Sequence, residues 1–438
     1  MSFTSKWHRL KELARKSIKM ICEGHFFTFI AKFYLFVIRY FFRHEKKQSC
    51  EKFYTVSELI YRTNAILTPL AVFRSPDECR RTRCLNFVTD ALGTSLLGGV
   101  GTALILASQY AIKNNMTLRI ITRTEEVNAK DYYEFMDLMR EALPNKVLFW
   151  SDSEREGMRG RVLEISNSDE FFTTSWWSTA AVSAANTGCR IFYIVQEVEP
   201  FFYPHGDLQL WCSWEMAKTD ICYIVNSFWL WDYLKDRYPA ICARGTWFDP
   251  AFPQFLYRPL TPSGKHKLFF YARPNHSRNL FLTGLMVIEE AFMRGILSPE
   301  QWDVYLAGDV CEKVEFAGGI RPQYLGRMKW KEYSQFLGSV DVVFSLMYTP
   351  HPSYPPLDSL ASGCVCVTNS FENKTSCPFC KNIFFCDLTI DSLCDGLRNG
   401  IKLALDRQTR YKNFEELSLP SDWSDTLKKT IDFMENFS

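Results

Sequence analysis

Short apolar runs alternate with longer helical stretches from Cys84 onward, and this alternation constrains the fold more than any other feature. The first set of runs comprises Cys84–Val88, Leu118–Thr122, Lys146–Phe149, Arg190–Val195 and Ile221–Val225. After a Pro-rich connector, the second set comprises Lys267–Tyr271, Asp303–Leu306, Val340–Ser345, Cys364–Thr368 and Ile383–Phe385. Strands that alternate with helices are typical of βαβ units and parallel sheets. The pattern therefore predicts an α/β chain with two Rossmann-like domains that face a cleft.

The length and composition fit this architecture. At roughly 150 residues per domain, 438 residues suffice for two or three domains. Hydrophobic residues at 47% and charged residues at 23% exclude a disordered chain and a polytopic membrane protein. We expect a helical extension at 1–80, a first Rossmann-like domain at 81–255, a second at 256–420 and a closing helix at 421–438.

The beginning of the chain is strongly basic. Residues 1–52 hold 12 Lys and Arg against 4 Asp and Glu, although the whole chain has a net charge of only +2. Polar side chains share one face of an otherwise apolar and aromatic helix, at His25, Thr28, Lys32, Arg39, Arg43 and Lys46. Such a helix is typical of the membrane interface. The alternatives are a helix that packs on its own protein or mediates oligomerisation and, third, a buried transmembrane helix. We predict a peripheral protein at the inner face of the cell membrane that docks on anionic lipid through residues 25–46.

Cysteine usage indicates a reducing compartment. The 15 cysteines are odd in number and scattered, and no signal peptide with a cleavage site is recognisable, which favours a cytoplasmic location. Five of them lie close together, at Cys364, Cys366, Cys377, Cys380 and Cys386. We expect these to be small buried thiols in preference to a zinc or redox site.

The segment Met347–Asn373 carries the strongest functional signal. A predicted strand ends just before it, and a Pro-rich turn leads into a short helix expected at Leu357–Ser362. The free N–H groups and positive dipole end of such a helix suit a diphosphate. Asp358, expected in the first turn, can reach a ribose diol or can simply complement the helix dipole.

Six motifs follow one another between Cys84 and Asp387. They are Gln196–Pro204, Phe270–Pro274 with Arg278 and Asn279, Tyr324–Gly326, His351–Asp358, Ala361–Gly363 and Val367–Lys374. Together they resemble the rhamnan-synthesising rhamnosyltransferases, a bacterial family of retaining-type GT-B glycosyltransferases. The resemblance implies a GT-B fold, a nucleotide-sugar donor, and no obligatory metal or other cofactor. The N-terminal amphipathic helical extension lies outside the matched region.

The resemblance also implies roles in the second domain. Arg273 and Arg278 would hold the donor diphosphate, which two guanidinium groups can neutralise without Mg²⁺. The other donor-side positions are Gly308, Tyr324, Leu325, Gly326, Ser353, Tyr354 and Asp358.

The first domain would supply the acceptor side of the cleft. Gly98 and Gly99 would let the backbone approach the ligand, or would permit close packing of helix and strand. Leu104 stands where a dinucleotide fingerprint requires its last glycine, which argues against NAD.

Further acceptor-side candidates come from two more segments of the first domain. Trp176, Trp177 and Gln196 are expected in the cleft, although the two Trp residues could instead belong to the core. The candidates that activate the acceptor hydroxyl are Glu197, Glu199 and Asp207, with His205 ranked last.

Two positions depart from the wider GT-B group, which has a Glu-x7-Glu pair where this chain has Pro350 and Asp358. The main hypothesis is a glycosyltransferase that moves a sugar, with L-rhamnose from dTDP-rhamnose favoured, to a lipid-linked or growing capsule or O-antigen glycan. The alternatives are a catalytically inactive GT-B scaffold that binds a glycan or a protein, and another GT-B enzyme such as an epimerase or a hexosyltransferase. The small net charge gives no reason to expect a nucleic-acid partner.

Overall fold

The computed structural model describes residues 53–75, 82–92, 96, 98–152, 162–260 and 264–437. The chain divides into two units between Thr63 and Asn64. Before that boundary the described part includes helix α3 (Val56–Thr63), none of whose residues is buried. The predicted interfacial helix at residues 25–46 lies outside the described residues. Within the described ranges, every helix is too short or too polar to cross a bilayer.

The first domain of the second unit is built on a seven-stranded sheet in which all neighbouring strands are parallel. In sheet order the strands are β4 (Val147–Ser151), β3 (Thr117–Thr122), β2 (Cys84–Thr89), β6 (Glu170–Thr173), β7 (Arg190–Val195), β8 (Ile221–Asn226) and β9 (Gly245–Phe248). Its helices are α4 (Gly99–Lys113), α5 (Ala129–Met139), α6 (Trp176–Ala184), α7 (Asp207–Glu215), α8 (Phe228–Leu234) and α9 (Pro239–Arg244). All residues of β2, β3, β6 and β8 are buried, as expected for a parallel sheet covered on both faces.

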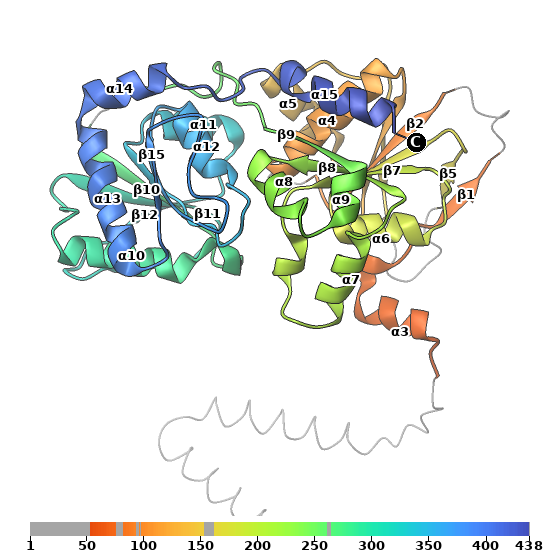
Figure 1. Ribbon diagram of the computed structural model, residues 1–438, viewed down its shortest axis with the longest axis horizontal. Helices are drawn as coiled ribbons and strands as arrows, with labels where there is room; N and C mark the ends of the chain where they lie inside the picture. Colours follow the sequence, from red (N-terminus) through yellow and green to blue (C-terminus); the bar gives the residue numbers. More distant parts are fainter. Residues whose placement is uncertain are drawn as a thin grey trace, which may run out of the picture. The chain divides into compact units, whose positions relative to one another are not determined.

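The second domain has a six-stranded parallel sheet (Figure 1). In sheet order the strands are β12 (Gln323–Gly326), β11 (Trp302–Gly308), β10 (His266–Ala272), β13 (Val342–Phe344), β14 (Val365–Asn369) and β15 (Ile383–Cys386). Its helices are α10 (Phe281–Met293), α11 (Trp330–Gly338), α12 (Tyr354–Ala361), α13 (Ile390–Leu405) and α14 (Arg407–Glu415). The α/β architecture with two parallel sheets agrees with the sequence-based prediction.

Five strands of the described residues were not predicted from the sequence pattern. Two of them, β1 (Val72–Arg74) and β5 (Leu163–Ile165), pair in a small separate sheet. The others are β6, β9 and β12, each of four residues. Runs this short carry too few apolar positions to show a strand period.

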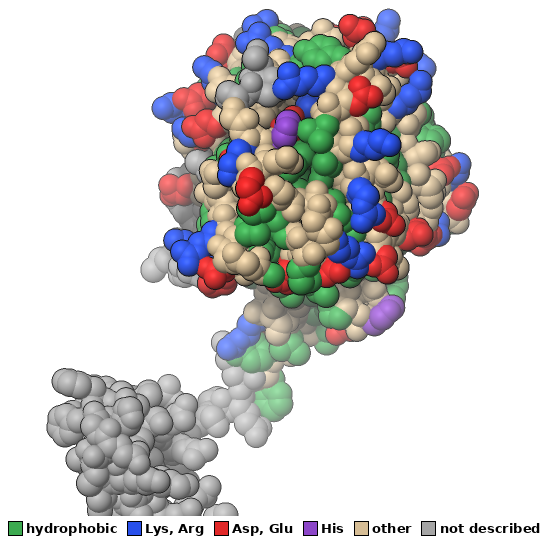
Figure 2. Space-filling view, turned by 90° about the vertical axis from the view of Figure 1, so that its left-hand side faces the viewer, with side chains coloured by type: hydrophobic (Ala, Val, Ile, Leu, Met, Phe, Trp, Pro, Cys, Tyr) green, Lys and Arg blue, Asp and Glu red, His purple; other side chains and the backbone are tan. Residues whose placement is uncertain are grey.

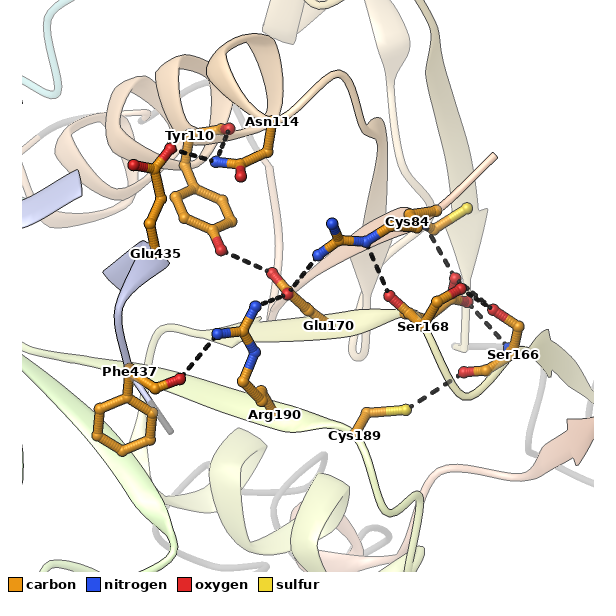
Figure 3. Close-up of polar contacts among 12 residues, drawn as sticks. Cys84, Tyr110, Asn114, Ser166, Ser168, Glu170, Cys189, Arg190, Glu435 and Phe437 are labelled. Atoms are coloured by element: carbon orange, nitrogen blue, oxygen red, sulfur yellow. Dashed lines mark hydrogen bonds and ion pairs between the residues drawn. The ribbon is translucent and has the colours of Figure 1, made fainter. Parts of the chain in front are cut away.

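The last helix, α15 (Trp423–Glu435), leads the chain from the second domain back over the first (Figure 1). Glu435 accepts a hydrogen bond from Asn114 at the end of α4, and Arg190 of β7 donates to the carbonyl oxygen of Phe437 at 2.8 Å (Figure 3). Arg190 also pairs with the buried carboxylate of Glu170, so the tail is joined to the middle of the first sheet.

Figure 2 views the second domain from its outer end. Acidic and basic side chains are interspersed on this face and gather in no large field of one sign. This mixture is in keeping with the formal net charge of +2.

Candidate active site

A cavity with a volume of about 610 Å³ lies between the two Rossmann-like domains. Its walls come from residues that follow or end the parallel strands, such as Thr89 after β2, Glu197 after β7 and Gly308 at the end of β11. Ligands of parallel α/β sheets bind at these carboxyl ends. The cavity brings together thirteen predicted site residues: Gly98, Gly99, Trp177, Gln196, Glu197, Glu199, Arg273, Arg278, Gly308, Gly326, Ser353, Tyr354 and Asp358.

Five candidates lie outside the lining of this cavity. Asp207 and His205 are exposed, because Asp207 occupies the first turn of α7, after the chain has left the cleft. Tyr324 and Leu325 are half-buried in and beside β12, and only their neighbour Gly326 reaches the cavity. The fifth candidate is Trp176, which is buried.

The two adjacent Trp residues differ in position. Trp176 is only 2% exposed, and its indole nitrogen donates to the hydroxyl of Tyr203 at 3.0 Å, so its side chain belongs to the core. Trp177 lines the cavity, and its indole nitrogen donates to the carboxylate of Asp90 at 2.8 Å. The prediction of a pair of cleft-facing Trp residues is therefore wrong for the first of them.

Cationic side chains gather on the second-domain wall. Asp309 accepts a hydrogen bond from Arg327 at 2.7 Å and lies 3.8 Å from the Nε atom of Arg273. One carboxylate thus faces two guanidinium groups. His276 contacts Arg273, and burial together with the neighbouring arginines lowers the pKa of His276 to about 4, so it is neutral at pH 7. The sequence reasoning missed Arg327, which follows the Tyr324–Gly326 motif directly.

Glu197 of the first domain is paired with residues of the second. Its Oε2 atom lies 3.4 Å from Nε of Arg278 and accepts a hydrogen bond from Thr349 at 3.2 Å. Burial raises the pKa of Glu197, and the guanidinium of Arg278 opposes this rise. The Glu197 carboxylate is therefore already paired with the Arg278 guanidinium, which would also attract an anionic ligand in the cavity.

Glu199 begins the short 3-10 helix Glu199–Phe202 and is 3% exposed. The backbone N–H of Trp176 donates to its carboxylate at 2.8 Å. Burial nevertheless raises the pKa of Glu199 to about 8. At pH 7 its carboxyl group is mainly protonated and can donate a hydrogen bond.

Helix α12 begins at Tyr354, three residues before the position expected from the sequence. Pro355 and Pro356 occupy its first turn, which places Asp358 in the second turn and corrects the first-turn prediction. Ser353, the residue before the helix, has a φ of 66°, a left-handed conformation. This local geometry turns the chain so that the beginning of α12 borders the cavity.

Asp358 is buried at the cavity wall and is 3% exposed. Its Oδ2 atom accepts a hydrogen bond from the hydroxyl of Tyr333 at 3.1 Å, whereas Oδ1 has no hydrogen-bond partner. Burial raises the pKa of Asp358 to about 7, although hydrogen bonds from tyrosine hydroxyls oppose the rise. This unpaired oxygen is itself buried, so a ligand hydroxyl reaches it only when the side chains around it shift.

The cleft glycines are required by close contacts. Gly98 has a φ of 62°, and a Cβ atom there would lie 3.1 Å from the ring of Tyr354. A Cβ atom on Gly99 would lie 2.3 Å from the side-chain oxygen of Gln196, whose amide donates to the Gly99 carbonyl at 2.8 Å. Only glycine fits this loop without displacing Gln196.

Metal-ligand geometry is not found in the described ranges: no three His, Cys, Asp or Glu side chains are grouped so that they could hold an ion. The clustered cysteines include Cys364 and Cys366, which are fully buried in or beside β14. Cys380 and Cys386 are also buried, Cys377 is half-buried, and all five are free thiols.

Comparison with known proteins finds similarity to parts of this chain. Residues 266–398 match the WsaF C-terminal domain family. A segment of 212 residues is 29% identical to the O-antigen biosynthesis protein RfbC of Myxococcus xanthus, covering 48% of this chain and 16% of that relative.

Solved structures are similar over most of the chain. TarM of S. aureus, solved with fondaparinux, alpha-GlcNAc-glycerol and UDP, has a TM-score of 0.60 at 7% identity, covering 81% of this chain and 100% of that chain. Sucrose-phosphate synthase of Thermosynechococcus elongatus has a TM-score of 0.56 at 10% identity, with 81% and 98% covered. Anabaena HepE, solved in complex with UDP, has a TM-score of 0.55 at 12% identity, with 81% and 99% covered. The predicted GT-B fold is thereby confirmed, and the second Rossmann-like domain of this GT-B protein matches the WsaF C-terminal domain family.

Proposed function

We propose that the protein is a glycosyltransferase that moves a sugar from a nucleoside diphosphate donor to a cell-surface glycan. The observation that supports this most strongly is the interdomain cavity of a GT-B fold, in which Arg273 and Arg278 lie with the beginning of α12. Guanidinium groups and helix N-termini both bind phosphate oxygens. The likeness to a WsaF domain and to an O-antigen biosynthesis protein supports a surface glycan as the product.

In the proposed reaction the second domain stabilises the departing diphosphate. Arg273 and Arg278 neutralise its charge, and the buried, unpaired oxygen of Asp358 accepts a hydroxyl of the donor ribose once the side chains around it shift. The first domain presents the acceptor hydroxyl, with Glu197 as the candidate for its activation, because the protonated Glu199 cannot accept a proton at pH 7. Closure of the domains excludes water, which strengthens each of these electrostatic interactions.

The donor and the location are finer parts of the same proposal. The motif resemblance favours dTDP-rhamnose, whereas the structures of HepE with UDP and with UDP-glucose support a UDP-sugar as the rival donor. We further propose metal-independent transfer at the inner face of the cell membrane, where the basic residues 25–46 would contact anionic lipid.

A thermal-shift panel tests the donor site. Wild type and Arg273→Ala would each be melted with dTDP, UDP, GDP, CMP and NAD. A ligand at a hundred times its Kd stabilises a fold by about 2.7 kcal/mol. We expect one nucleoside diphosphate to stabilise the wild type and to have little effect on Arg273→Ala, because the variant lacks one diphosphate ligand. No response to any nucleotide would contradict the proposal.

The alternative of an inactive scaffold is motivated by Pro350 in place of the first Glu of the wider group's pair. It predicts the same nucleotide response without donor turnover. Incubation with dTDP-rhamnose and UDP-glucose, followed by detection of released nucleoside diphosphate, separates the two. Release supports the enzyme, and binding without release supports the scaffold.

A further inference from the structure

Four aromatic rings from both domains meet in one cluster, which we call the aromatic ridge (Phe201, Tyr233, Tyr348 and Phe371). Phe371 is at its centre. The ring of Phe371 lies 5.2 Å from that of Tyr348 and 6.4 Å from that of Phe201, centroid to centroid. Phe201 and Tyr233 belong to the first domain, so the ridge is complete only where the two domains meet.

Two rings of the aromatic ridge are exposed to solvent close to the cavity, whereas Phe371 is half-buried and Tyr233 is only 6% exposed. Tyr348 is 55% exposed and Phe201 is 41% exposed, which is unusual for members of a packed aromatic cluster. Their chain neighbours Met347 and Phe202 line the cavity, and the guanidinium of Arg278 lies 4.5 Å from the Phe202 ring centre. The ridge therefore extends the cavity wall outward into solvent.

A buried amine holds the second-domain part of the ridge in place. Phe371 and Lys374 exchange two backbone hydrogen bonds of 3.0 and 2.8 Å around a tight turn. The Lys374 side chain passes beneath the turn, is 1% exposed, and donates to the carbonyl of Met347 at 2.8 Å. The Lys374 amine, which is costly to bury, thus joins the turn that holds Phe371 to the loop that holds Tyr348.

Charged groups border the rings. Arg237 lies 3.7 Å from the ring centre of Tyr233 and forms an ion pair with Glu372 at 2.6 Å, and both charged side chains are more than two-fifths exposed. Rigid rings beside exposed hydrogen-bonding groups suit a sugar. The negative face of an aromatic ring attracts the weakly positive C–H bonds of a pyranose, and the charged groups can bind its hydroxyls.

We propose that the aromatic ridge is the docking site of the acceptor glycan, whose end enters the cavity past Phe202 and Met347. This inference rests on the proposed function and specifies the acceptor as a carbohydrate chain of more than one residue. Because rings of both domains form the ridge, the acceptor site is assembled only in the closed arrangement.

Affinity electrophoresis of the full-length protein tests the proposal. Native gels would contain soluble O-antigen polysaccharides released from lipid by mild acid. We expect at least one of them to retard the wild type, and Tyr348→Ala and Phe201→Ala to weaken that retardation at least tenfold. Tyr348→Phe, which keeps the ring, should behave as the wild type. Tyr411→Ala removes a similarly exposed ring on α14 and serves as the matched control.

The thermal response to UDP and dTDP, measured on the same variants, separates the two proposals. If a nucleotide stabilises the wild type but no polysaccharide retards it, or if Tyr348→Ala and Phe201→Ala are retarded as strongly as the wild type, the ridge proposal is overturned and the donor site stands. Loss of the nucleotide response in Tyr348→Ala would assign the ridge to domain closure and would also overturn its glycan role. If no nucleotide binds the wild type, the proposed function itself fails.

Discussion

At the scale of single residues, Glu197 connects the acceptor and donor sides of the cavity. Its carboxylate pairs with Arg278, which is also the expected ligand of the donor diphosphate. Donor binding must therefore compete with Glu197. We expect Glu197→Gln to strengthen the binding of the preferred nucleoside diphosphate by about tenfold, or about 1.4 kcal/mol, because the guanidinium becomes available. Calorimetric titration measures this change.

A matched control for Glu197→Gln is Glu125→Gln, which removes an exposed carboxylate from the same cavity wall. It should alter nucleotide affinity much less. Unchanged or weaker binding by Glu197→Gln would show that the Arg278 pair does not oppose the donor.

The pKa of Glu199 predicts a pH-dependent contribution to stability. Burial raises it from 4.5 to about 8, so between these values the folded chain binds more protons at this site than the unfolded chain. The contribution of Glu199 to stability therefore falls as the pH rises from 4.5 to 8. We expect Glu199→Gln to lose less stability than the wild type between pH 5 and pH 7 in urea unfolding.

The effect of Glu199 is read from the difference in stability between the wild type and Glu199→Gln, because other groups titrate in the same pH range. The pKa of His276 is lowered to about 4, which makes its own contribution rise between pH 4 and 6.5. The contribution of His276 is the same in the wild type and in Glu199→Gln, so it cancels when the two stability profiles are subtracted. Identical pH profiles for wild type and Glu199→Gln would contradict the buried, protonated state of Glu199.

At the scale of elements, strand β6 illustrates how a buried charge enters a parallel sheet. It begins with Glu170, which is 2% exposed and lies between β2 and β7. The carboxylate accepts a hydrogen bond from the Tyr110 hydroxyl at 2.9 Å and pairs with Arg83 and Arg190 (Figure 3). Strand β6 starts with an acidic residue and is only four residues long, so it has no apolar pattern from which it could be predicted.

Removing one donor tests this cluster. Tyr110 is fully buried on α4, and Tyr110→Phe leaves the Glu170 carboxylate with one hydrogen bond fewer. Since hydrogen bonds to charged groups contribute roughly 1.5–3 kcal/mol, we expect the free energy of unfolding to fall by about 2 kcal/mol. Denaturant titration measures the loss. Tyr411→Phe, at an exposed tyrosine, should change stability by less than about 0.5 kcal/mol.

At the scale of the whole molecule, the second domain inserts a side chain of α12 into the first. The Tyr354 hydroxyl lies 2.6 Å from the hydroxyl of Thr102 and accepts a hydrogen bond from Asn226 at 2.7 Å. Trp330 of α11 also donates to the Leu96 carbonyl at 2.9 Å. These contacts keep the cavity closed from two sides.

Loss of the Tyr354 hydroxyl should loosen this closure. Tyr354→Phe leaves the buried amide of Asn226 without its partner, which costs about 1–3 kcal/mol. We expect a lower melting temperature and, by small-angle X-ray scattering, a larger radius of gyration of the free protein. A radius equal to that of the wild type would mean that the remaining contacts hold the domains closed without this hydroxyl.

The fold class and thirteen of the residues that line the cavity could be predicted from the sequence. Long buried strands such as β2 and β8 are mostly apolar because parallel strands are covered on both faces, and the order of strands and helices then places their carboxyl ends at one cleft. The motif resemblance assigned Arg273 and Arg278 to that cleft, and Asp358 was expected there because it lies in a short helix that follows a Pro-rich turn. The apolar runs and the motifs each consist of residues close together in the sequence, so they can be recognised without the tertiary structure.

Which of two neighbouring residues faces the cavity depends on the tertiary fold. Trp176 and Trp177 are adjacent, yet one is in the core and the other lines the cavity, because successive helical side chains point in different directions. The pair of Glu197 with Arg278 joins residues of different domains, and no spacing along the chain indicates it. The raised pKa values follow from burial, which depends on all surrounding elements and is absent from any single segment.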